Sequence, residues 1–165
     1  MERRQRSREI MKDYVRWALV VLMTVLLVFL LRWVKQLDIH EVTEVYDGDT
    51  IRIRDGRNIR LIGVNAPEVD SPYTREEPFG KESREHLRKL LAGRKVQIRE
   101  GSVSVDRYGR VLAYVYAGDV LVNGRIIQDG WAQADVRFSY KNKDLFIAYE
   151  KEAKARKIGM WKRLP

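Results

Sequence analysis

The stretch EVTEVYDGDTIRIRDGRNIRLIGV, residues 41–64, decides the fold of this chain. Three segments within it have the short, apolar and largely alternating pattern of β-strands: Glu41–Tyr46, Thr50–Arg54 and Asn58–Val64. The residues between them, Asp47-Gly48-Asp49 and Asp55-Gly56, are typical of tight turns. The stretch therefore predicts three short strands joined by two turns.

Downstream of this stretch the sequence continues with strands and adds helices. A long polar loop is marked by Pro67, Pro72 and Pro78, and two further strands are predicted at Lys95–Glu100 and Arg110–Tyr116. The expected helices are Gly80–Leu91, Asn123–Asp129 and about Asp144–Lys157. Five short strands with helices inserted late predict an α+β fold over residues 41–165. The expected architecture is a small, partly open five-stranded β-barrel of the oligonucleotide-binding (OB) type with about three helices.

The first 40 residues have a different composition. From Trp17 to Leu31 the chain is apolar except for Thr24, and the apolar character extends over residues 14–35, about the twenty residues that a bilayer-spanning helix needs. A cleaved signal peptide would end in a small-residue cleavage site, and a core helix would have a polar face. Because this segment has neither, we expect a transmembrane signal anchor at 14–35, followed by a linker at 36–40.

The distribution of charge predicts how this anchor is oriented. Six basic residues between positions 3 and 16 precede the apolar run, whereas only Arg32 and Lys35 follow it closely. By the positive-inside rule, residues 1–13 form a basic cytoplasmic tail, and the domain at 41–165 lies outside the cytoplasm. The sequence thus predicts a single-pass protein of the cell membrane, bound to the lipid bilayer through its N-terminal helix.

Overall composition narrows the chemistry. The chain has 32 Lys and Arg against 23 Asp and Glu, a net charge of +9 that suits a nucleic acid or an anionic membrane surface, although many proteins are basic for solubility alone. It has no cysteine, which excludes disulfides and thiolate metal sites. His40 and His86 lack metal-ligand spacing and are interpreted as ordinary surface residues.

Four motifs in the predicted domain carry polar side chains suited to catalysis: Val45-Tyr46-Asp47-Gly48-Asp49-Thr50, Arg60-Leu61-Ile62-Gly63-Val64-Asn65-Ala66-Pro67-Glu68, Asp106-Arg107-Tyr108-Gly109-Arg110 and Gly130-Trp131-Ala132. One Asp-Gly turn alone would mean little. In this order and spacing the motifs closely resemble the staphylococcal nuclease (thermonuclease) family. The resemblance covers essentially all of residues 41–165.

The residue types suit hydrolysis of a phosphodiester. Such a reaction requires neutralisation of charge on the phosphate oxygens and an oriented or deprotonated water. Arginine binds those oxygens through two parallel hydrogen bonds, and carboxylates bind a hard divalent cation. A bound metal ion therefore explains why acids and arginines occur in the same site.

The family resemblance implies a role for each of these residues. Arg60 and Arg110 correspond to two arginines that hold the phosphate, and Glu68 to the carboxylate that orients or deprotonates the attacking water. Asp49 corresponds to a metal-binding aspartate, and the implied metal is Ca²⁺. The residues alone indicate only a hard cation that prefers oxygen ligands.

Two implied metal ligands depart from the family pattern. Asn65 stands where the family's type member has a second metal-binding aspartate, and Ala66 would supply its backbone carbonyl. An asparagine oxygen still binds Ca²⁺, but the lost negative charge should lower the affinity. Asp47 either shapes its turn or supports the metal from behind.

Substrate contacts are expected from aromatic side chains that stack on bases. Val136 and Phe138 align with two tyrosines of the family, and Phe138 with Tyr140 is the alternative pair for their role. Tyr108 is either a substrate contact or a packing residue.

The leading hypothesis is a membrane-anchored, Ca²⁺-dependent nuclease that hydrolyses DNA, with RNA as a second expected substrate. Each of these residues also has a simpler structural explanation. Asp49 could be a turn residue and Glu68 a charged loop residue, and the two arginines could be solvated charges on strands. The alternative is a non-catalytic nucleic-acid-binding OB-fold module on a membrane anchor. A pure binder has no use for Asp49 and Glu68 beside phosphate, and a structural or scaffold domain would not need the arginine pair. Both points favour the enzyme. No protein partner is implied.

Overall fold

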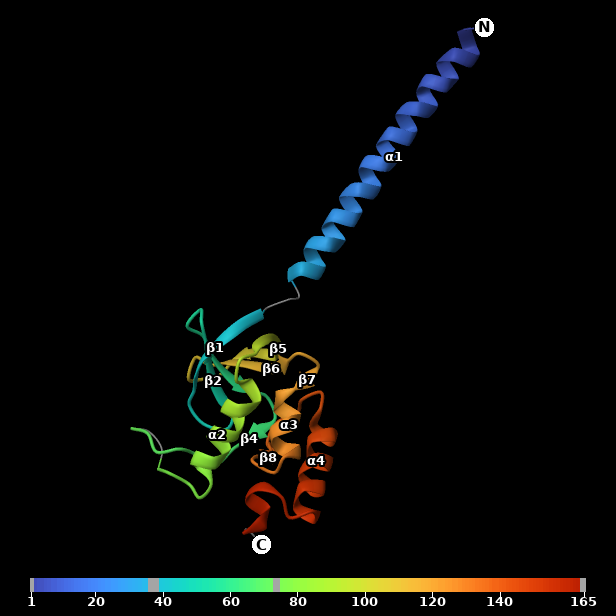
Figure 1. Ribbon diagram of the computed structural model, residues 1–165. Coiled ribbons are helices and arrows are strands. Elements are labelled where there is room, and N and C mark those ends of the chain that lie inside the picture. The colour runs from blue at the N-terminus through green and yellow to red at the C-terminus, as the bar shows by residue number, and fades with distance from the viewer. Residues whose placement is uncertain (1, 36–38, 73–74, 164–165) are drawn as a thin grey trace. The chain divides into compact units, whose positions relative to one another are not determined.

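The computed structural model describes residues 2–35, 39–72 and 75–163 (Figure 1). The chain divides into two compact units, residues 1–37 and 38–165. The first unit is one helix, and the second contains every strand and the remaining helices of the described residues.

Helix α1 (Glu2–Lys35) contains no glycine or proline that would interrupt it. Its stretch Tyr14–Leu31 has a mean hydropathy of 2.4 and no residue buried within the structure, so by length and composition it is a candidate membrane span. The hydroxyl of Thr24 donates to the carbonyl of Val21 at 2.8 Å, which satisfies this polar side chain inside the helix. The helix also extends through the predicted basic tail, from Glu2 onwards.

The predicted linker at 36–40 is corrected in part. Residues 36–38 lie outside the described part of the chain, whereas Ile39 and His40 already belong to strand β1. They pair with Gln97 and Val96 of β5. Because of this pairing with a distant strand, β1 begins at an earlier residue than the alternation of residue types predicts.

The second unit is built on strands whose order in the chain differs from their order in the sheet. The bounds are β1 (Ile39–Val45), β2 (Thr50–Ile53), β3 (Asn58–Leu61), β4 (Val64–Asn65), β5 (Lys95–Val105), β6 (Val111–Ala117), β7 (Val120–Leu121) and β8 (Gln133–Ala134). Within residues 39–72 and 75–163, five strands run in the order β3-β2-β1-β5-β6, and β3 pairs in parallel with β6. This last pairing closes the barrel, so the α+β OB-type fold is confirmed, but the expectation of a partly open barrel is wrong.

The barrel is filled by the inward-facing residues of its strands. Ile51, Ile59 and Val96 are completely buried, as are Ala113 and Val115 of β6. The alternation that predicted β2 reflects this packing, because every second residue of a strand faces the interior.

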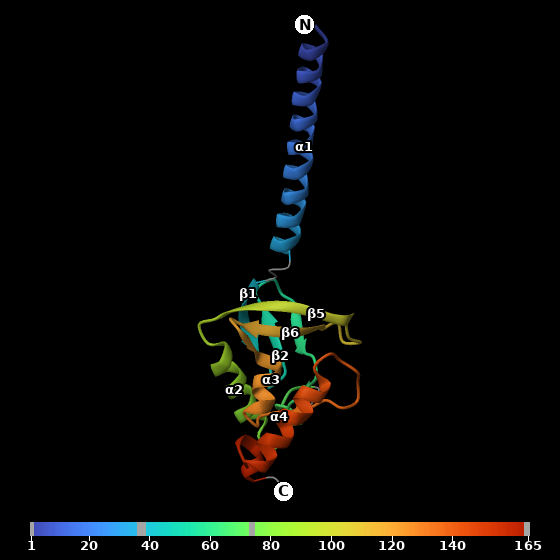
Figure 2. The ribbon, with the colours of Figure 1, turned by 90° about the vertical axis from the view of Figure 1, so that its right-hand side faces the viewer.

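Helices cover the barrel and connect its far ends. They are α2 (Gly80–Leu91), α3 (Val122–Gln128), α4 (Lys143–Ala155) and a short 3₁₀ helix, η1 (Gly159–Lys162). Helices α3 and α4 pack side by side in both views, and Phe146 of α4 is completely buried (Figures 1 and 2). The predicted helix at 80–91 is confirmed to the residue. The other two predicted helices differ from α3 and α4 by one or two residues at each end.

A buried asparagine ties α3 to the barrel. The Asn123 side-chain oxygen accepts from the Val115 N–H at 2.8 Å. Its amide nitrogen donates to the carbonyls of Ile62 and Ala113 at 3.0 and 3.1 Å. These three bonds fix the chain just beyond Arg60 and just before Asn65, which positions the candidate site.

Candidate active site

The bend at Asp47-Gly48-Asp49 places a carboxylate in the protein interior. A Cβ at Gly48 would lie 1.9 Å from Ser83 Oγ of α2 and 2.6 Å from Ala66 Cβ, so only glycine allows the bend to pack this closely. Asp47 stabilises the bend because its carboxylate accepts from the Asp49 N–H at 2.8 Å. Asp49 itself is only 3% exposed.

Besides its contact with Asp47, the carboxylate of Asp49 is held by Thr50, Arg60 and Ala66. Its Oδ1 accepts from Thr50 Oγ1 at 3.0 Å and forms an ion pair with Nη1 of Arg60. Its Oδ2 accepts from the Ala66 N–H at 2.9 Å. The β2–β3 register, which sets Thr50 opposite Arg60, brings the arginine to this carboxylate.

Arg110 reaches the same place from the β5–β6 hairpin. Asp106 accepts from the backbone N–H and from Nε of Arg110 at 3.0 and 2.8 Å, and thereby fixes the direction of the guanidinium. Arg110 Nη1 then donates to Thr50 Oγ1 at 3.3 Å. Thr50 therefore links Arg110 to the carboxylate of Asp49.

Glu68 lies in the loop that precedes α2. A Cβ at Gly80 would lie 2.1 Å from the Glu68 carbonyl, so the start of α2 packs directly on this loop. Burial raises the pKa of the Glu68 carboxyl and the charge of Asp49 raises it further, while Arg60 and Arg110 act in the opposite direction. The carboxyl of Glu68 is thus within electrostatic range of all three other predicted residues.

Asp47 and Asp49 form a pair of carboxyls that suits a cation. Burial raises the pKa of Asp47 to about 8, with further contributions from the charge of Asp49 and a hydrogen bond to its side chain. The Asp47 carboxyl therefore keeps its proton near neutral pH when no cation is present. A hard divalent ion nearby would favour the ionised form of Asp47, so the residues fit the expected metal.

Asn65 and Ala66 adjoin this pair. Asn65 lies in β4, which pairs with β8 through Asn65 and Gln133. The N–H of Ala66 is bonded to Asp49, so Ala66 lies beside that carboxylate and Asn65 precedes it in the chain. No group of three or more His, Cys, Asp or Glu with metal-site geometry occurs among the described residues, so any ion here would also need amide, carbonyl or water oxygens.

Comparison with known proteins agrees with this geometry. The sequence model described as "Staphylococcal nuclease homologue" matches residues 58–163. The chain is 36% identical over 126 residues to a thermonuclease of Staphylococcus hyicus, covering 74% of this chain and 75% of the relative. It is 34% identical over 142 residues to an uncharacterized endonuclease of Escherichia coli, covering 82% and 86%.

The chain belongs to the staphylococcal nuclease family. It is a nuclease, a hydrolase, as its thermonuclease and endonuclease relatives are named. The family match includes Arg60, Glu68 and Arg110, and begins after the Asp47–Asp49 bend. The non-catalytic alternative considered from the sequence is therefore set aside.

Two acidic residues that orient arginines in this nuclease were missed from the sequence. Asp106 holds Arg110, and Asp135 holds Arg137 through hydrogen bonds from the backbone N–H and Nε, both to Oδ1, and from Nη2 to Oδ2. The available signal was the short Asp-to-Arg spacing, four residues in one case and two in the other. Such spacing lets an aspartate at a turn accept from a following N–H and from the arginine side chain together.

The aromatic residues proposed as substrate contacts differ in exposure. Tyr108 and Phe138 are 68% and 65% exposed, and Val136 is also exposed, as a surface for nucleotides requires. The alternative Tyr140 is half-buried: its ring lies 5.7 Å from that of Phe146, and its hydroxyl donates to the Gly63 carbonyl at 3.4 Å. Tyr140 is therefore a packing residue.

The interpretation of both histidines as ordinary surface residues is wrong. His86 Nε2 lies 2.8 Å from Asp129 Oδ2, which joins α2 to the end of α3. His40 Nδ1 lies 3.5 Å from Asp55 Oδ2, a contact that joins β1 to the β2–β3 turn. Both contacts are made between segments distant in the sequence, and neither contributes to the site around Asp49.

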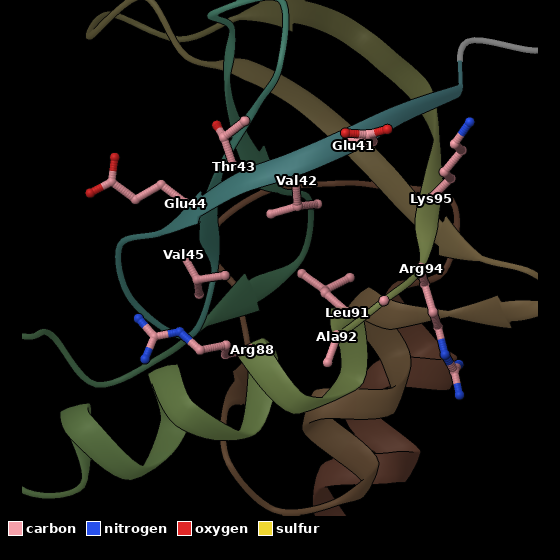
Figure 3. A pocket seen from close by; sticks show the side chains of 11 residues that line it. Glu41, Val42, Thr43, Glu44, Val45, Arg88, Leu91, Ala92, Arg94 and Lys95 are labelled. Carbon is pink, nitrogen blue, oxygen red and sulfur yellow. The ribbon is translucent and has the colours of Figure 1, made fainter.

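The structure also has a groove outside this site. It is lined by residues 41–45 of β1, by Arg88 of α2 and by residues 91–95, which connect α2 to β5 (Figure 3). Asp49, Arg60, Glu68 and Arg110 do not line it, so the groove plays no part in the catalytic argument.

Proposed function

We propose that this chain is a membrane-anchored, Ca²⁺-dependent nuclease that hydrolyses the phosphodiester bonds of DNA and RNA by in-line attack of water. The observation that carries the proposal is the convergence of Asp49, Arg60 and Arg110 through Thr50, with Glu68 in the same electrostatic environment. The arrangement combines groups that neutralise a phosphate with a group that accepts a proton.

The two arginines differ in their exposure and in the aspartate that holds each of them. Arg60 is 14% exposed and paired with Asp49, whereas the side chain of Arg110 is 27% exposed and held by Asp106. Guanidinium groups fixed in this way bind the nonbridging oxygens of a phosphate without first becoming ordered. We assign to Arg60 and Arg110 the stabilisation of charge on the phosphate under attack.

Glu68 is assigned to the attacking water. Burial and the nearby Asp49 raise its pKa, which makes its carboxylate a better proton acceptor than an exposed glutamate. A water held by this carboxylate would be deprotonated or oriented opposite the leaving oxygen. By family likeness the 5′-oxygen leaves, and products carry 3′-phosphate ends.

The cation would be held by oxygens of Asp49, Asn65 and the Ala66 carbonyl, with Asp47 in support. When bound, Ca²⁺ supplies positive charge at the phosphate and polarises its oxygens. Because Asp49 is already paired with Arg60, the protein must share this carboxylate between the guanidinium and the ion. Neutral Asn65 lowers the charge available for binding, so we expect weaker Ca²⁺ affinity than a second aspartate would give.

The anchor is assigned to α1. The Tyr14–Leu31 stretch supports a single membrane span, and the basic residues before it support an N-terminus in the cytoplasm with the nuclease domain outside. Carbonate-resistant sedimentation with membranes, together with protease access to residues 39–163 from outside the cell, tests this assignment. Release by carbonate, or protection from external protease, would contradict it.

The activity is tested with the full chain in detergent and an end-labelled oligonucleotide. Cleavage is expected with added Ca²⁺, with 3′-phosphate ends, and is expected to stop when a chelator removes the ion. Arg110→Lys should be nearly inactive, because lysine lacks the planar fork, and Arg156→Lys at the C-terminal cap of α4 serves as the matched control. Equal cleavage with and without chelator would remove Ca²⁺ from the mechanism.

A further inference from the structure

An ion pair beside the site is not used in the mechanism above. Asp135 is 8% exposed and follows β8, and its N–H donates to the Gly63 carbonyl at 2.9 Å. Its carboxylate accepts from Arg137 through the backbone N–H at 3.0 Å, Nε at 2.9 Å and Nη2 at 2.8 Å. A buried carboxylate thus holds a guanidinium that is itself largely in solvent.

The pair repeats the arrangement that holds Arg110. In both cases one aspartate at a turn accepts from the backbone N–H and Nε of a following arginine. Hydrogen bonds and charge from Arg137 lower the pKa of Asp135, so the carboxylate is ionised and both members of the pair are charged. An arginine fixed in this way is already ordered, so it loses little conformational entropy when it binds a phosphate.

Arg137 lies next to the predicted metal ligands. The pairing of β4 with β8 sets Gln133 opposite Asn65 and continues with Asp135 beside Gly63. From there the Arg137 side chain places its Nη2 3.5 Å from Asn65 Oδ1. The charge of Asp49 contributes to the raised pKa of Arg137, after the larger contributions of Asp135. The guanidinium is therefore within electrostatic range of the carboxylate that anchors the site.

The side chain of Arg137 is exposed to solvent. Its side chain is 64% exposed, compared with 14% for Arg60 and 27% for Arg110. Its guanidinium carbon lies 5.7 Å from the ring centre of Phe138, which is also exposed. A cation beside an exposed ring is the combination that binds a single nucleic acid strand, through a phosphate and a stacked base.

We propose that Arg137 is a third substrate-binding arginine, which contacts the backbone phosphate next to the one held by Arg60 and Arg110. This rests on the proposed function, because it takes the site around Asp49 as the place of cleavage. Asp135 is a positioning residue that acts through Arg137. The neighbouring phosphate is the one assigned because Arg137 is the outermost of the three guanidinium groups.

The competing explanation is purely structural: Arg137 would only neutralise buried Asp135. The two explanations differ in what they predict for the dependence of binding on salt. A phosphate contact displaces counterions, so binding becomes less sensitive to salt when the contact is lost. For a single strand, the slope of the logarithm of the binding constant against the logarithm of the salt concentration should become shallower by about 0.7. A structural contact changes thermal stability and leaves this slope as it was.

The test measures binding of a fluorescent single-stranded octanucleotide to the full chain in detergent, with chelator present so that nothing is cleaved. Arg137→Ala is compared with Arg156→Ala. Arg156 is also 64% exposed and paired with a glutamate at 3.1 Å, but it is the C-terminal cap of α4, and its partner Glu152 is not one of the site residues. Arg137→Ala should weaken binding about tenfold and flatten the salt slope by about 0.7, whereas Arg156→Ala and Arg137→Lys should retain the slope.

A dinucleoside monophosphate, which has one phosphate, then competes with the octanucleotide. Its inhibition constant should be the same for Arg137→Ala and Arg156→Ala, because the neighbouring phosphate is missing. Equal octanucleotide binding by the two alanine variants, absence of binding by the wild type, or an equal loss for the one-phosphate competitor would each overturn the proposal. Since cleavage and Ca²⁺ are not involved, this outcome is separate from failure of the proposed catalytic function.

Discussion

Asp49 and Arg60 form an ion pair in which the two side chains are only 4% and 14% exposed. The pair is fixed from both sides, since Asp49 also accepts from Thr50 and from the Ala66 N–H, and Arg60 is held in the β2–β3 register. Removing one member of such a pair leaves a buried charge without a partner. The stability of the fold and the chemistry of the site are therefore coupled at this point.

Glu68→Gln should remove most of the turnover and little of the stability. Glutamine keeps the size of the side chain but does not accept a proton, so kcat should fall about a thousandfold. Steady-state cleavage and thermal unfolding of the same preparation check this, with Glu76→Gln as the control, because Glu76 lies in the same loop and pairs with Lys81. A fall in Tm that accounts for the lost activity would contradict the role given to Glu68.

Asp106→Asn should impair the enzyme through Arg110. The weakened hold on the guanidinium leaves Arg110 less well directed at Thr50 and the phosphate, and kcat/KM should fall up to about a hundredfold. Asp55→Asn is a matched control, because Asp55 accepts from the N–H and Nε of Arg57 at 3.0 and 2.8 Å outside the site. If both variants lose activity equally, the effect lies in the fold and not in the orientation of Arg110.

Without metal, the stability of residues 38–165 should fall as pH rises through neutrality. Burial and the charge of Asp49 raise the pKa of Asp47 to about 8 in the folded state, compared with about 4 in the unfolded chain. Between these values the folded state binds more protons than the unfolded state, so the free energy of unfolding declines with pH. Urea unfolding in chelator from pH 5 to 8 measures this slope.

The control for the pH measurement is a pair of substitutions. Asp47→Asn should flatten the slope, because asparagine does not titrate and still accepts from the Asp49 N–H. Asp119→Asn, in the exposed turn between β6 and β7, should leave the slope unchanged. An identical slope in wild type and Asp47→Asn would show that Asp47 is ionised in the folded protein.

Local features of this fold were predictable from the sequence. The bend at Asp47–Asp49 and the helix Gly80–Leu91 follow from turn residues and from apolar spacing. The order and spacing of motifs also indicated Asp49, Arg60, Glu68 and Arg110. The structure brings these four into one environment, although their roles in catalysis are proposals.

Other features depend on contacts between distant residues and have no local signal. The parallel β3–β6 pairing that closes the barrel joins Ile59–Leu61 to Val111–Ala113. The Arg137 side chain reaches Asn65 only because β8 returns to pair with β4. Sequence periodicity describes which face of a strand is buried, but it does not state which strand lies beside it.

Asn123→Ala should be among the most destabilising single substitutions outside the site. It removes the bonds to the Val115 N–H and to the carbonyls of Ile62 and Ala113, although the Ala113 carbonyl still accepts from the Ile62 N–H at 3.0 Å. We expect a loss of about 3 kcal/mol in the free energy of unfolding. Asn142→Ala, before α4, has no side-chain capping bond and should cost far less in the same urea titration.

In the proposed mechanism a cation and two arginines meet at one phosphate. The decisive measurement is a structure of the protein with Ca²⁺ and a non-cleavable thymidine dinucleotide. We predict the ion about 2.3–2.6 Å from an Asp49 oxygen and from a phosphate oxygen, with Arg60 and Arg110 bonded to that same phosphate. An ion bound elsewhere, or a phosphate that touches neither arginine, would contradict the account.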